Sequence, residues 1–161
     1  MALNKETEFY NALRDSGLHK EGWDLLILYS QFCLESGYGS NELVREANNP
    51  FSVKAGSSWK GEVYLLKDNP EVINGKQVTI PDVFRKYPSL SAAILCQSKF
   101  IEKRFSHSYE KRGIFNEYFY NLIHGEPYKY ATGPLYVEHC INIYNRLANQ
   151  NNGEFKELLN G

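Results

Sequence analysis

The spacing of apolar residues predicts that most of this chain is helical. After Asp24, large apolar side chains recur every three or four positions, at Leu25, Leu28, Tyr29 and Phe32. This period is typical of a buried α-helix. Asp24 is a suitable N-cap for that helix, and the glycine at position 37 supplies a stop signal.

The same period predicts further helices in the N-terminal part of the chain. A first helix begins at Asn4 or Thr7 and ends near Gly17. We expect it to pack against the helix that follows Asp24. A short helix capped by Ser40 comes next and ends before an Asn-Asn-Pro sequence.

The C-terminal half is predicted to be helical as well. Ser89 caps a helix that runs through residue 100. The core stripe of that helix is predicted to contain Ile94, Leu95 and Phe100. Apolar stripes predict two more helices, over residues 115–123 and about 135–147.

Between residues 59 and 87 the pattern changes to that of β-strands. Residues 63–66 and 77–80 are rich in β-branched and apolar side chains, and Asn74-Gly75 lies between them. Asn-Gly is the strongest short signal for a hairpin turn. We therefore expect a small β-hairpin lobe that projects from a helical body.

Glu35 is an unusual residue in the predicted helix after Asp24. At about 100° per residue it falls on the stripe of Leu28 and Phe32 rather than on a solvent face. Two features are expected to raise the pKa of Glu35: its apolar neighbours and the partial negative charge of the helix C-terminus. No Lys or Arg lies within one turn before it to oppose this rise. A protonated carboxyl near neutral pH suits a general acid. The alternative is a helix-end glutamate that turns to solvent or caps a neighbouring backbone.

Length and composition limit the classes of protein. The chain has 161 residues, of which 42% are hydrophobic, and this suits one domain with its own core. We place that domain at residues 1–148 and read residues 149–161 as a linker-like break with a short tail. A net charge of −1 gives no electrostatic footprint for nucleic acid or an anionic membrane.

Cys33, Cys96 and Cys140 are three widely spaced cysteines in apolar surroundings. This arrangement argues against a disulfide framework and a zinc site, so we expect three free thiols and no metal or cofactor. The first residues contain no apolar segment. We therefore expect no signal peptide and no membrane anchor, and we expect the chain to be synthesised in the cytoplasm. We expect a monomer.

Several blocks of the sequence resemble one family. Residues 31–40 read Gln-Phe-Cys-Leu-Glu-Ser-Gly-Tyr-Gly-Ser, which is similar to the Gln-x-x-Leu-Glu-Ser-Gly-Trp-Gly-x-Ser block of glucosaminidase domains in glycoside hydrolase family 73. That family includes flagellar peptidoglycan hydrolases and autolysins. Residues 48–54 resemble its Asn-x-x-Phe-Gly-Ile-Lys block, residues 84–87 its Phe-Arg-x-Tyr strand, and residues 130–136 its Tyr-Ala-Thr-Asp-Pro-x-Tyr block. Ser52 replaces the glycine of the first of these blocks and Gly133 the aspartate of the last.

The resemblance, which covers roughly residues 16–144, implies roles for individual residues. Glu35 takes the place of the catalytic acid, and Tyr130 that of the active-site tyrosine. The family's second acidic residue precedes an Asn-Gly turn in the β lobe, a position that Glu71 matches, with Glu62 and Asp68 as alternatives. Substrate-binding roles are implied for Tyr38, Asn48, Phe51, Trp59 and Tyr136.

The implied fold is α+β but mainly α: a lysozyme-like helical body with a small β-hairpin lobe and a glycan groove between them. The implied function is an endo-β-N-acetylglucosaminidase that cleaves the β-1,4 bonds of peptidoglycan and acts on the bacterial cell wall after phage-type release or dedicated secretion. One alternative is a muramidase or lytic transglycosylase on the same polymer. Another is a non-catalytic wall-binding module.

Overall fold

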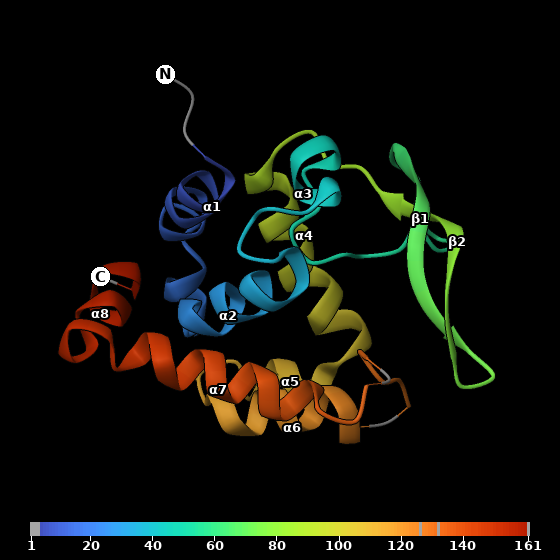
Figure 1. The fold of residues 1–161 in the computed structure, drawn as a ribbon. Helices are drawn as coiled ribbons and strands as arrows, with labels where there is room; N and C mark the ends of the chain where they lie inside the picture. The colour runs from blue at the N-terminus through green and yellow to red at the C-terminus, as the bar shows by residue number, and fades with distance from the viewer. Residues whose placement is uncertain (1–3, 126, 132, 161) are drawn as a thin grey trace.

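Helices form a body to one side of a long two-stranded hairpin in the computed structural model, which describes residues 4–125, 127–131 and 133–160 (Figure 1). The helices are α1 (Lys5–Arg14), η1 (Leu18–Glu21), α2 (Leu25–Ser36), α3 (Glu42–Ala47), α4 (Leu90–Arg104), α5 (Ser106–Glu110), α6 (Phe115–His124), α7 (Tyr136–Ala148), η2 (Gln150–Gly153) and α8 (Glu154–Asn160). The strands are β1 (Val63–Ile73) and β2 (Lys76–Arg85). The predicted mainly helical α+β fold is confirmed.

Helix α2 lies at the centre of the body. Its N-cap Asp24 accepts a hydrogen bond from the backbone N–H of Leu26, and its C-cap Gly37 has the left-handed φ of 58° that favours glycine. Phe9 of α1 stacks on Phe32 with ring centroids 3.9 Å apart, which confirms the predicted packing of these two helices. Because residues 25–33 are all buried, the last turn of α2 projects from a rigid core.

Two details of the predicted helices were wrong. The N-cap of α3 is Asn41, whose side chain accepts from the backbone N–H of Val44 at 3.1 Å, whereas the Ser40 hydroxyl donates to a carbonyl of the preceding turn. Ser89 does cap α4, but Leu95 in that helix is 46% exposed. Because Ile94 faces the core, the next residue is turned by about 100° towards solvent.

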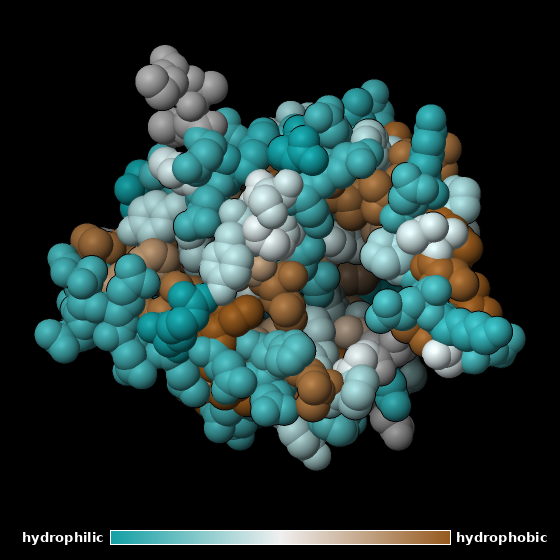
Figure 2. Space-filling model, viewed as in Figure 1, coloured by the Kyte–Doolittle hydropathy of each residue, from teal (hydrophilic) through white to brown (hydrophobic). Residues whose placement is uncertain are grey.

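The hairpin has one face towards the body and one towards solvent. Asn74 and Gly75 form its turn, both with positive φ, as the sequence predicted. A register shift between Leu66 and Asn69 bends β1 and increases its twist. The outer face leaves several apolar side chains exposed, namely Val63, Leu65, Val72 and Val83. Figure 2 shows hydrophobic surface, in brown, over the hairpin.

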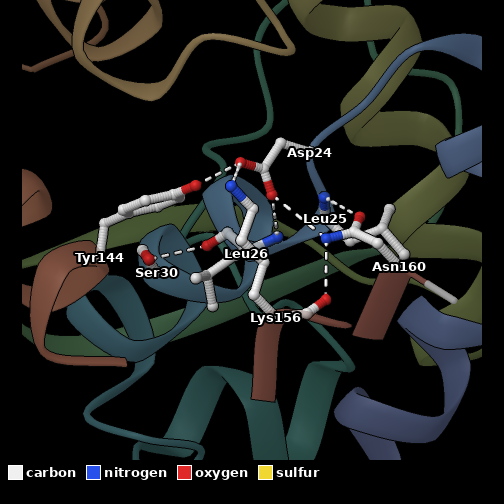
Figure 3. A network of polar contacts seen from close by, with 7 residues as sticks. All are labelled: Asp24, Leu25, Leu26, Ser30, Tyr144, Lys156 and Asn160. Carbon is white, nitrogen blue, oxygen red and sulfur yellow. Dashed lines mark hydrogen bonds and ion pairs between the residues drawn. The ribbon is translucent and has the colours of Figure 1, made fainter. Parts of the chain in front are cut away.

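The C-terminal segment, expected from the sequence to be a linker-like break and a tail, packs onto the body. Phe155 of α8 makes an edge contact with Tyr29 of α2, and Leu159 is 1% exposed. The side chain of Asn160 accepts a hydrogen bond at 2.9 Å from the backbone N–H of Leu25 (Figure 3). Helix α8 therefore satisfies a donor at the N-terminus of the central helix.

Asp24 is the centre of this contact between α8 and α2. Besides capping α2, its carboxylate accepts a hydrogen bond from the Tyr144 hydroxyl and pairs with Lys156 at 3.1 Å (Figure 3). Three elements distant in sequence thus share one buried carboxylate.

We expect Asp24→Ala to lower the free energy of unfolding by about 2–4 kcal/mol, because it removes a helix cap and leaves the buried Tyr144 hydroxyl without its partner. Urea titration followed by circular dichroism measures this. Asp15→Ala is the control: Asp15 is exposed and pairs only with exposed Arg14 in the described residues, so its loss changes stability by less than about 0.5 kcal/mol. Equal effects of the two substitutions would contradict the prediction.

Candidate active site

Glu35, in the last turn of α2, lies where two cavities meet. The first cavity has a volume of about 460 Å³ and is lined by Phe51 and Tyr130 of the body and by Arg85 at the end of β2. The second has a volume of about 440 Å³ and extends between α3 and the hairpin. Glu35, Ser52 and Lys54 line both. The two cavities form one groove, visible in Figure 2 as the hollow between the body and the hairpin.

Burial raises the pKa of Glu35 from its ordinary value of 4.5 to about 7, and a hydrogen bond with the Tyr136 hydroxyl opposes this rise. Its backbone carbonyl accepts from the Ser52 hydroxyl at 3.0 Å and from the Asn41 side chain at 3.1 Å. These two bonds hold the end of α2. At neutral pH, a large fraction of Glu35 is therefore a protonated acid in a defined position.

A chain of hydrogen bonds orients the hydroxyl that reaches Glu35. The Tyr118 hydroxyl donates to the side-chain oxygen of Gln31 at 2.9 Å, so the amide nitrogen of Gln31 faces Tyr136. That nitrogen donates to the Tyr136 oxygen at 3.1 Å. The Tyr136 hydroxyl keeps its own proton for the Glu35 carboxyl and the Cys140 thiol beside it, and its interaction with Glu35 favours the ionised carboxylate that remains after a proton is given away.

Tyr130 lines the first cavity from the segment before α7. Its hydroxyl accepts a hydrogen bond from the Gln97 side chain at 2.9 Å, and none of the described residues accepts the proton of that hydroxyl. Burial keeps the pKa of Tyr130 well above its ordinary value. The hydroxyl is therefore a hydrogen-bond donor throughout the physiological pH range.

Glu71 of β1 lines the second cavity together with Glu35. One of its oxygens accepts from Lys54 at 3.1 Å and from the Asn69 side chain at 2.9 Å. Lys54 also pairs with Asp82 of β2 at 2.9 Å, and this bond lowers the pKa of Asp82. Lys54 thus ties the body to both strands and holds Glu71 at the groove.

The comparison with protein families decides the classification of this fold and site. A family model described as mannosyl-glycoprotein endo-beta-N-acetylglucosaminidase matches residues 14–149, which is most of the chain. The chain belongs to this glucosaminidase family. The match confirms the resemblance predicted from residues 31–40 and the other blocks.

Two curated relatives and one solved structure show how far the similarity extends. The peptidoglycan hydrolase FlgJ of Vibrio cholerae is 28% identical over 143 residues, 85% of this chain and 41% of that protein. The exo-glucosaminidase LytG of Bacillus subtilis is 43% identical over 61 residues, 38% of this chain and 21% of that protein. The chain thus spans about two fifths or less of the length of these relatives. The catalytic domain of the autolysin Auto from Listeria monocytogenes shares the fold, with a TM-score of 0.66 at 16% identity over 98% of this chain and 89% of that one.

In this glucosaminidase domain, two residues expected to bind substrate lie away from the groove. The ring of Tyr38 lies 5.5 Å from the guanidinium of Arg146 on α7, and its hydroxyl accepts a hydrogen bond from that side chain. Asn48 is the C-cap of α3, and its side chain donates to the carbonyl of Tyr87 at 3.2 Å. Neither Tyr38 nor Asn48 is among the described residues that line the two cavities.

The other three expected binding residues lie closer to the groove. Phe51 lines the first cavity, although it is only 2% exposed. Tyr136 is buried beside Glu35. Trp59 packs against the guanidinium of Arg85, which lines the first cavity. Trp59 and Tyr136 therefore act on the groove through neighbouring residues.

Of the candidates for the second carboxylate, the structure brings only Glu71 into the part of the groove lined by described residues. Glu62 and Asp68 are exposed, and neither is among the described lining residues. Sequence reasoning missed Asn69, although a residue two positions before Glu71 points to the same face of a strand. It also assigned no role to Lys54, which closes the block at residues 48–54.

Three further sequence expectations concern thiols, metal sites and membrane-spanning segments. The structure has Cys33, Cys96 and Cys140 as free thiols, as predicted. Within residues 4–125, 127–131 and 133–160 there is no group of three His, Cys, Asp or Glu side chains arranged to hold a metal ion. In the same ranges, no helix has both the length and the apolar character needed to span a bilayer.

Proposed function

We propose that this chain is a peptidoglycan hydrolase, an endo-β-N-acetylglucosaminidase that uses Glu35 as its general acid on the bacterial cell wall. The observation that carries the proposal is a carboxyl with a pKa of about 7 at the junction of two cavities. The cavities on the two sides of Glu35 provide room for the sugars that flank an internal glycosidic bond of the glycan.

In the proposed reaction, Glu35 protonates the glycosidic oxygen of a β-1,4 bond. The Tyr136 hydroxyl stabilises the carboxylate that this transfer leaves. Glu71 stabilises the oxocarbenium-like transition state or activates the attacking water, and Lys54 and Asn69 hold it in place. The Tyr130 hydroxyl donates a hydrogen bond to the acetamido group of the substrate or to that water and keeps its proton.

Product analysis tests this function. Purified peptidoglycan is digested, the new reducing ends are reduced with borohydride, and the fragments are identified by mass spectrometry. Reduced GlcNAc ends are expected. Reduced MurNAc ends would instead show a muramidase, and anhydro-MurNAc ends a lytic transglycosylase. No soluble product from a folded protein would show a non-catalytic wall-binding module.

The pH dependence of the rate provides a separate prediction. Since only the protonated form of Glu35 can act as the acid, kcat/KM falls as pH rises through about 7 and declines about tenfold per unit above it. Initial rates on a soluble glycan between pH 5 and 9 measure this, with circular dichroism at each pH as the control for folding. A constant kcat/KM from pH 6 to 9 would contradict the role of Glu35.

A further inference from the structure

The two ends of the groove carry opposite charge. Among the described residues that line the first cavity, four are cations, Lys54, Arg85, Arg104 and Lys129, and one is a carboxyl, Glu35. The described lining of the second cavity has the reverse balance, with three carboxyls, Glu35, Glu42 and Glu71, and one cation, Lys54. Hydrolysis of a glycosidic bond by two carboxyls does not require the positive end.

Arg85 of β2 is held in place by aromatic rings. Its guanidinium carbon lies 4.6 Å from the ring centre of Trp59 and 5.1 Å from that of Phe100. In the described part of the chain, its Nη1 donates to the Cys96 thiol at 3.8 Å and its Nε is buried without a hydrogen-bond partner, while no carboxylate lies within ion-pair distance. A rigid guanidinium that lines a cavity and has no carboxylate beside it in the described part of the chain is suited to a carboxylate ligand, which matches its planar geometry.

Arg104 and Lys129 extend this positive charge along the first cavity. The guanidinium of Arg104, at the end of α4, lies over the ring of Tyr128 at 4.1 Å. Neither Arg104 nor Lys129 forms an ion pair with any residue in the described ranges. Lys54 differs from both, because Glu71 and Asp82 balance its charge. Arg85, Arg104 and Lys129 are thus three cations of the first cavity that have no carboxylate partner among the described residues.

We propose that the first cavity is a subsite for a carboxylate carried by the glycan, bound by Arg85 with Arg104 and Lys129. This inference rests on the proposed function and makes its substrate class specific: strands that carry free carboxylates, rather than uncharged polymers of N-acetylglucosamine. In peptidoglycan the carboxylate has two sources. One is the lactyl group of a muramic acid without peptide, and the other is the peptide stem itself.

Calorimetric binding to the Glu35→Gln protein tests the subsite without any need for turnover. Three fragments of equal glycan length are compared: one with peptide stems, one without peptide and with free lactyl carboxylates, and one whose carboxylates have been converted to methylamides. We expect at least one charged fragment to bind tenfold or more tightly than the methylamide. This advantage shrinks as salt rises from 50 to 500 mM, an experimental range over which the Debye length falls from about 14 to about 4 Å. The tighter of the two charged fragments identifies the source of the carboxylate.

Substitutions locate the effect. In the same background, Arg104→Gln with Lys129→Gln is expected to reduce the affinity ratio of charged to methylamide fragment by fivefold or more. Lys99→Gln with Lys103→Gln is the matched control. Both lysines are exposed residues of α4 outside the described lining of the cavity, and this double substitution removes two positive charges, as the first one does. We expect this control variant to keep the wild-type ratio of affinities for the charged and the methylamide fragment.

Equal binding of charged and methylamide fragments would overturn the subsite, as would an equal loss of the ratio in both double variants. These outcomes are separate from a failure of the proposed function. If the wild-type protein releases no product from peptidoglycan but the charged fragment still binds more tightly, the subsite stands and the hydrolase assignment falls. If the wild-type protein does release product and the three fragments bind alike, the hydrolase assignment stands and the subsite falls.

Discussion

Glu35→Gln is expected to reduce kcat for glycan cleavage at least a hundredfold while the fold is kept. Glutamine has nearly the shape of glutamic acid but has no acid proton to give to the glycosidic oxygen, and proton transfer of this kind contributes about 10²–10⁴-fold to a rate. Clearing of a peptidoglycan suspension measures the loss. A well-folded variant with more than a tenth of the wild-type rate would contradict the assignment.

The same substitution is expected to increase stability at alkaline pH. Below about pH 4.5, Glu35 is neutral in both the folded and the unfolded chain. As pH rises from 4.5 to about 7, the unfolded chain ionises first, so wild-type stability falls across this window and stays lower above it. Glutamine does not ionise. The stability of Glu35→Gln relative to wild type therefore rises by about 2–3 kcal/mol between pH 5 and pH 8.

Urea titrations at the two pH values measure this difference. Glu46→Gln, which changes an exposed glutamate of α3, is the control and should show a difference between pH 5 and pH 8 close to zero. If Glu35→Gln behaves like Glu46→Gln, the carboxyl at position 35 is not held neutral by burial. Activity loss together with the stability gain would show that Glu35 is a destabilising residue retained for chemistry.

Glu71→Gln is expected to lower kcat and kcat/KM together by a hundredfold or more on a soluble glycan oligomer. A group that acts mainly in the transition state reduces both constants, whereas a residue that only contacts the substrate would mainly raise KM. The amide keeps the shape of the side chain but loses the negative charge that pairs with Lys54. Unchanged melting of the variant separates chemistry from folding.

Glu62→Gln and Asp68→Asn are the matched controls for Glu71→Gln. Both remove one carboxylate from β1 or the segment before it, and neither residue is among the described residues that line the groove. We expect each to keep kcat within about threefold of wild type, as is usual for an exposed position away from the reacting atoms. A severe loss in either, with near-normal activity of Glu71→Gln, would reassign the second carboxylate.

Much of the secondary structure was predictable because its signals act over a few residues. Asp24 and Ser89 cap helices through their own backbone neighbourhood, Gly37 ends α2 with a left-handed φ, and Asn74-Gly75 closes the hairpin. The motif around Glu35 was equally local. One helical turn of spacing was enough to place that carboxyl on the apolar stripe, and burial is indeed the main cause of its raised pKa.

The composition of the groove depends on contacts between distant segments. Arg85 comes from β2, Arg104 from α4 and Lys129 from the segment before α7, so no spacing along the chain brings their charges together. Tyr38 belongs to the same motif as Glu35, yet its side chain meets Arg146 about a hundred residues later. A motif specifies residue types, whereas the direction of a side chain follows from what packs beside it.

The C-terminal residues show most clearly that local sequence does not specify contacts between distant segments. Residues 149–153 have the polar and glycine-containing composition of a linker, and this composition led us to end the domain at residue 148. In the structure, Asn160 hydrogen-bonds to the backbone of Leu25, and Lys156 pairs with the buried carboxylate of Asp24. Local composition describes the flexibility of an isolated segment. Whether α8 docks depends instead on the unsatisfied donors and the carboxylate that α2 presents, which lie more than 130 residues earlier in the chain.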